Sequence, residues 1–155
     1  MWFIANPTML YTGATVFSLI SKDILSKVIG VGISGIEYIF GYMTSSNANV
    51  YIKKYKNDLE VLDIELKLKL IDNWLKHIDM EKVQTDSSHE IIYKGISDSC
   101  YKLTDCINQI NEKIKYHHTK WFQSWIGLYL DEDIKLLEKH VKIIDDRLLL
   151  LNLLK

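Results

Sequence analysis

The chain has 155 residues, of which 48% are apolar and 25% are charged, and its net charge is −1. This is enough chain for one domain with a real interior. Acidic and basic residues balance along the whole length, which excludes the one-signed basic field that binds nucleic-acid phosphates. All but one of the 19 basic residues are Lys, and only Arg147 offers the guanidinium favoured for bidentate phosphate or carboxylate recognition.

Residues 1–46 form an apolar, glycine-containing front segment whose centre reads KVIGVGISGIEYIFGYM. The run from Gly30 to Gly35 matches the GxGxxG pattern of dinucleotide-binding turns. Only eight residues separate Gly35 from the polar turn TSSNAN at 44–49, which is short for a crossover helix, and helical spacing follows. We therefore favour close helix packing, for which the candidates lie four apart: Ser26, Gly30 and Ser34.

The same front segment leaves a membrane role open. It carries no charge through Ser21 but lacks the basic start of a signal peptide. A span over 28–46 would place Glu37 near the bilayer centre, which is costly. Peripheral or conditional insertion therefore remains the alternative to burial in a protein core.

The remaining chain, residues 50–155, predicts three long amphipathic helices near 50–83, 88–118 and 131–154. Apolar residues recur by threes and fours, which is helical spacing. In 50–83 they form two stripes, which indicates one broad apolar face: Ile52, Tyr55, Leu59, Leu62 and Leu66, then Val61, Ile64, Leu68, Ile71, Leu75 and Ile78. Capping residues in TDSSHE at 85–90 and three acids in YLDEDI at 129–134 mark the later starts.

These elements predict an all-α fold, an antiparallel four-helix bundle with a single domain over 1–155. Proline is absent after Pro7, which permits long helices, and short connections make consecutive helices antiparallel. The first helix, within 14–45, is expected to be sheltered by the other three and to be a candidate for a break at the glycines of 30–35.

No catalytic, cofactor-binding or metal-binding residues are predicted, so the chain is expected not to be an enzyme. The five histidines form no HExxH pair, and no GxSxG elbow occurs. Cys100 and Cys106 cannot face each other from one helix, because six residues turn the helix by about 240°. We expect both to be reduced in an intracellular protein.

The segment HHTKWFQSWIGLYL at 117–130 concentrates aromatic residues. It either caps the end of the bundle or offers a patch for a protein partner or a membrane interface. The interaction candidates are Trp121, Phe122, Trp125 and Tyr129.

Two resemblances bear on function. HHTKWFQSW followed by LLEKHVKIIDDRLLLL resembles the ends of small helical proteins of large AT-rich DNA viruses, which implies a viral source and leaves a virion location open. The apolar first helix followed by DLEVLDIELKLKLIDNWL is similar in plan to HeLo-like four-helix bundles, some of which permeabilise membranes.

The expected function is protein–protein contact, in a homo-oligomer formed through the heptad-like seams and the leucine-rich last helix. A membrane-acting bundle is the alternative.

Overall fold

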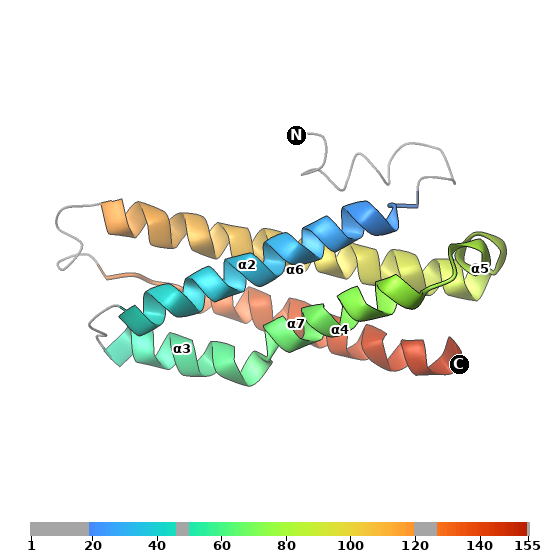
Figure 1. Cartoon of the computed structure of the whole chain (residues 1–155). Coiled ribbons are helices and arrows are strands. Elements are labelled where there is room, and N and C mark those ends of the chain that lie inside the picture. Colours follow the sequence, from blue (N-terminus) through green and yellow to red (C-terminus); the bar gives the residue numbers. More distant parts are fainter. Residues whose placement is uncertain (1–18, 46–49, 120–126, 155) are drawn as a thin grey trace.

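A computed structural model describes residues 19–45, 50–119 and 127–154 of the protein, and within those ranges every regular element is helical (Figure 1). The all-α prediction is confirmed. The glycines that imitate a nucleotide-binding turn lie inside a helix. The elements in chain order are α2 (Lys22–Ser45), α3 (Val50–Leu62), α4 (Ile64–His77), α5 (Met80–Thr85), α6 (Ser87–Thr119), α7 (Asp131–Leu151) and the short 3₁₀ helix η2 (Asn152–Leu154).

Helix α2 runs through its glycines without interruption, so the candidate break at 30–35 is absent. The Ser21 side chain caps its start, accepting a hydrogen bond from the Ile24 amide at 3.2 Å. Neighbouring helices hold the chain helical despite the low helix propensity of glycine, since tertiary packing overrides propensity.

The single helix predicted over 50–83 is wrong, because the chain divides into α3, α4 and α5. Asp63 separates α3 from α4 with φ 49° and ψ 42°, a left-handed conformation that Asp tolerates better than most residues. The buried stripe changes at this point. It follows Ile52, Tyr55 and Leu59 in α3, and then Ile64, Leu68, Ile71 and Leu75 in α4. The two sequence stripes thus serve two helices, and Leu66 of the first stripe and Val61 of the second remain exposed.

Helices α2 and α6 make the most extensive contact between two helices of the described chain (Figure 1). Helix α4 packs on α2, and α7 packs on α6 and also contacts α3. Consecutive long segments reverse direction, whereas the neighbours α2 and α6 run in the same direction (Figure 1). The packing of two parallel helices side by side is a departure from a bundle in which all neighbours are antiparallel.

Two glycines of α2 allow the close contact with α6. A Cβ atom on Gly32 would lie 2.7 Å from the Thr104 Oγ1 atom, and one on Gly35 would lie 2.6 Å from the Ile107 Cγ2 atom. Both distances are shorter than any normal contact between such atoms. Glycine at these two positions therefore lets α6 approach the backbone of α2.

Side chains of α6 also donate hydrogen bonds to backbone carbonyl groups of α2. The Tyr93 hydroxyl donates to the Ile20 carbonyl at 2.6 Å, just before α2 begins. Thr104 donates to Val28 at 3.2 Å, and the Asn111 amide donates to Gly35 at 3.1 Å. The partners advance together along both helices, which fixes their parallel register.

The close-packing prediction for Ser26, Gly30 and Ser34 selected a different face of α2 from the one that contacts α6. Gly30 and Ser34 are exposed, and a Cβ atom on Gly30 would meet nothing within 4 Å. Ser26 is half-buried and donates a hydrogen bond to Asp72 of α4 at 2.7 Å. The small-residue spacing was real, but Gly32 and Gly35 are the residues that face a neighbouring helix.

Candidate functional site

The predicted aromatic candidates precede α7. Trp121, Phe122 and Trp125 lie outside the described residues. Tyr129 is 72% exposed, whereas its neighbours Leu128 and Leu130 are buried. The described part of this segment therefore both closes the core and presents one aromatic side chain to solvent.

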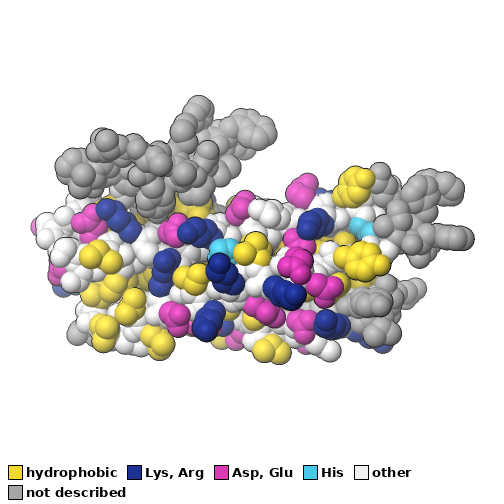
Figure 2. Space-filling model, turned by 180° about the vertical axis from the view of Figure 1, so that it is seen from behind, with side chains coloured by type: hydrophobic (Ala, Val, Ile, Leu, Met, Phe, Trp, Pro, Cys, Tyr) yellow, Lys and Arg dark blue, Asp and Glu magenta, His cyan; other side chains and the backbone are white. Residues whose placement is uncertain are grey.

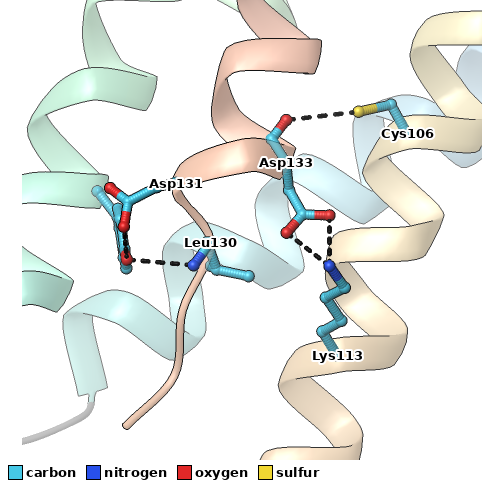
Figure 3. A network of polar contacts seen from close by, with 6 residues as sticks. Cys106, Lys113, Leu130, Asp131 and Asp133 are labelled. Atoms are coloured by element: carbon cyan, nitrogen blue, oxygen red, sulfur yellow. Dashed lines mark hydrogen bonds and ion pairs between the residues drawn. The ribbon is translucent and has the colours of Figure 1, made fainter.

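A buried tyrosine, Tyr55 of α3, fixes the point where α7 begins, and Figure 3 labels its two partners there, Leu130 and Asp131. The Tyr55 hydroxyl of α3 donates to an Asp131 carboxylate oxygen at 3.1 Å and accepts from the Leu130 amide at 3.1 Å. Lys54 adds an ion pair to Asp131 at 3.5 Å. Burial is the main cause that raises the pKa of Tyr55, so the phenol stays neutral and keeps its donor.

The first turn of α7 is also tied to α6 (Figure 3). Both Asp133 carboxylate oxygens accept from the Lys113 ammonium at 2.8 Å. The Cys106 thiol donates to the Asp133 carbonyl with a sulfur–oxygen distance of 3.7 Å. These contacts are structural, because every polar group in them has a partner inside the fold.

The two thiols lack the features of reactive cysteines. Burial raises the pKa of Cys100 to about 12 and that of Cys106 to about 11. A thiol, not a thiolate, is then present at neutral pH, and the thiol is a poor nucleophile and metal ligand. Within the three described ranges, no group of His, Cys, Asp and Glu side chains is arranged to hold a metal ion.

Apolar side chains gather where α7 ends. Leu149 is 67% exposed, Leu150 is 43% exposed and Leu153 of η2 is 77% exposed. We call these three residues the C-terminal ridge. In Figure 2, hydrophobic side chains collect at the end of the molecule where α6 begins and α7 ends. Isolated exposed leucines are ordinary, but a contiguous apolar group marks an interaction surface.

An open groove of about 500 Å³ lies beside this ridge, between α4 and the end of α7. We call it the α4–α7 groove. Lys67 of α4 and Asp145 of α7 form an ion pair at 2.9 Å, three residues before Leu70 and Leu148. The apolar lining consists of Leu70, Trp74, Ile78, Leu148, Leu151 and Leu154, and the polar lining of His77, Asp79, Lys82, His89 and Asn152.

The sequence indicated one side of this surface. The leucine-rich last helix was expected to supply the contact, and the ridge belongs to it. The α4 side was missed, because Leu70 and Trp74 lie outside the two stripes used to define that helix. Their spacing from the exposed Leu66, by fours, is the signal that could have revealed a second apolar face.

No family model, curated protein or solved structure matches the chain. The resemblances to viral helical proteins and to HeLo-like bundles therefore stay predictions.

Proposed function

We propose that the protein is a non-enzymatic helical interaction protein that self-associates. The observation that supports this best is the C-terminal ridge, whose three leucines expose large apolar surface at one end of the molecule. Burying an exposed leucine side chain stabilises an association by about 1.5–3 kcal/mol before the costs of association. A surface of this kind gains most from a partner that covers it.

The proposed architecture is an antiparallel four-helix bundle whose second member is divided into α3 and α4. The directions of the long segments agree with this plan (Figure 1). The α2–α6 pair forms one side of the bundle, with α4 packed on α2 and α7 packed on α6. On the opposite side α4 and α7 are neighbours, joined by the Lys67–Asp145 ion pair. The edge between α4 and α7 is where the groove opens.

Light scattering coupled to size-exclusion chromatography tests self-association. The chain mass is 18.1 kDa, and we expect at least twice that mass at micromolar concentration. Dilution should shift the mass toward the monomer, because association follows mass action. A strict monomer at every concentration would contradict the proposal.

A membrane-acting bundle is the second candidate, supported by one observation. Among the described residues, α2 is a helix long and apolar enough to cross a bilayer, although the core helix of a soluble protein meets the same criterion. Its outward face carries Val31 and Tyr38, both exposed. Flotation of the full chain with anionic phospholipid vesicles tests this candidate. Binding that Val31→Lys abolishes supports it, and no flotation rejects it.

A further inference from the structure

We propose that the C-terminal ridge of one molecule enters the α4–α7 groove of a second copy about a two-fold axis, with Lys82 of each copy against Asp146 of the other. This inference rests on the proposed self-association and names its surface. It assigns a symmetric dimer in which each molecule contributes both a ridge and a groove.

The leucines at the end of α7 face two different directions. Leu148, Leu151 and Leu154 line the groove, whereas Leu149, Leu150 and Leu153 project from the same turns as the ridge. Successive helical residues point about 100° apart, so the ridge cannot fold back into its own groove. A second copy can fill the groove, because a two-fold axis brings each surface patch against the same patch of the partner.

The walls of the groove fit an apolar helix end. Trp74, Leu70 and Ile78 offer one aromatic and two aliphatic contacts from α4 and the residue after it. Apolar helical faces bind in grooves of this composition. Leucine side chains supplied by the ridge would exclude water from both partners at once.

Charged side chains around the ridge and the groove give independent support. Several charged groups around the surface already have partners: Lys67 pairs with Asp145, and Arg147 with Asp98. Asp79 caps α5 by accepting from the Glu81 amide. Among the described residues, Lys82 at the groove and Asp146 beside the ridge carry opposite charges and lack an ion pair, as does Lys142 one turn earlier on α7. Lys82 lines the groove, and Asp146 is exposed before the ridge.

The opposite charges of Lys82 and Asp146 favour a second copy over an unrelated apolar partner. A two-fold axis perpendicular to α7 sets the two copies of that helix antiparallel. Asp146, about one turn before the ridge, then lies toward the end of the partner that carries α5 and Lys82, and the same contact occurs twice (Figure 1). Complementary charges at the edge of an apolar contact select the partner and its orientation.

The first experiment removes the ridge. We compare the wild type, the double variant Leu149→Asp and Leu153→Asp, and the matched control Val61→Asp by light scattering. Val61 is 84% exposed but lies on α3. We expect the ridge variant to be monomeric with unchanged helical circular dichroism and the control to keep the wild-type mass.

The second experiment tests the charge contact between copies. Lys82→Glu and Asp146→Lys each place two like-charge contacts in a homodimer, which should raise the dimer dissociation constant roughly tenfold. An equal mixture of the two variants should regain the wild-type constant. In the mixed dimer the introduced acid at position 82 faces the introduced base at position 146, and the native contact between Lys82 and Asp146 forms once. A contact within one molecule could not be restored by mixing.

The outcomes separate the inference from the proposed function. A wild-type oligomer whose mass survives the double ridge substitution overturns this surface and leaves self-association standing. A mixture that stays as weak as its components overturns the Lys82–Asp146 contact. A wild type that is monomeric at all concentrations, or a ridge that binds only vesicles, overturns both.

Discussion

Replacing Gly35 by alanine tests the physical basis of the fold most directly. The new methyl group would lie 2.6 Å from the Ile107 Cγ2 atom and 3.0 Å from the Asn111 Nδ2 atom. The Cγ2 atom is bonded directly to the Ile107 Cβ atom, so it can yield only if χ1 rotates or α6 moves. Movement of α6 would also lengthen the bond from Asn111 to the Gly35 carbonyl.

The expected magnitude combines three effects. Overpacking a core costs about 1–3 kcal/mol, and a weakened buried hydrogen bond costs about 1 kcal/mol more. Alanine in place of glycine gains roughly 1 kcal/mol of helix propensity. The net expectation for Gly35→Ala is a loss of about 1–3 kcal/mol in the free energy of unfolding.

Gly30→Ala is the matched control on the same helix. A Cβ atom there meets nothing within 4 Å, so only the propensity gain remains and the protein should be stabilised by up to about 1 kcal/mol. Urea unfolding followed by circular dichroism at one protein concentration measures both variants. Adding Ile107→Ala should reduce the cost of Gly35→Ala, because it removes the clashing atom. Equal effects of the two alanines, or no coupling to Ile107, would refute the close-approach explanation.

Three further predictions follow from single contacts. Tyr55→Phe should lower the free energy of unfolding by about 1–2 kcal/mol, because it removes the partner of the buried Leu130 amide, and Tyr129→Phe should change it little in the same urea titration. Ser26→Ala should raise the pKa of Asp72, because the hydrogen bond from the Ser26 hydroxyl is the main cause that lowers it, and NMR titration checks this. The stabilisation from Asp72 is present above the ordinary pKa of 3.8 and is lost as pH falls through the lower folded value. The variant should therefore lose less stability in acid, as pH-dependent unfolding can check. Cys100 and Cys106 should react with an aromatic disulfide reagent only after urea unfolding, because burial keeps both thiols protonated, and rapid labelling of the native protein would contradict this.

The long later helices could be predicted because their apolar periodicity is sustained and their starts carry capping or acidic residues. The helix predicted over 88–118 is observed as α6, Ser87–Thr119. The helix predicted over 131–154 is observed as α7, Asp131–Leu151, followed by η2. The division at Asp63 could not be predicted, because no proline or glycine marks it. The left-handed conformation of Asp63 is visible only from its φ angle. The apolar stripes of α3 and α4 were interpreted as one broad face of a single helix.

The close contact was missed for a different reason. Small-residue spacing identifies faces on which a helix can be approached, but it does not say which face has a neighbour. Thr104 and Asn111 decide that question, since each donates to a carbonyl group of α2. The groove was missed for a similar reason. Leu70 and Trp74 can be recognised as groove residues only once the end of α7 is known to lie beside them.

The same contacts bear on whether α2 can leave the core for a membrane. Its buried face would exchange one apolar environment for another, with little change in free energy on that side. The cost falls on α6, where Thr104 and Asn111 are buried polar groups that would lose their carbonyl partners. Water could solvate them only after the bundle opens, and Ile107 and the other apolar residues of that face would then be exposed as well. Release of α2 therefore requires another partner for the exposed face of α6. Insertion of a single helix from an otherwise intact bundle is the less favourable route, whereas the C-terminal ridge is available for contact without any such opening.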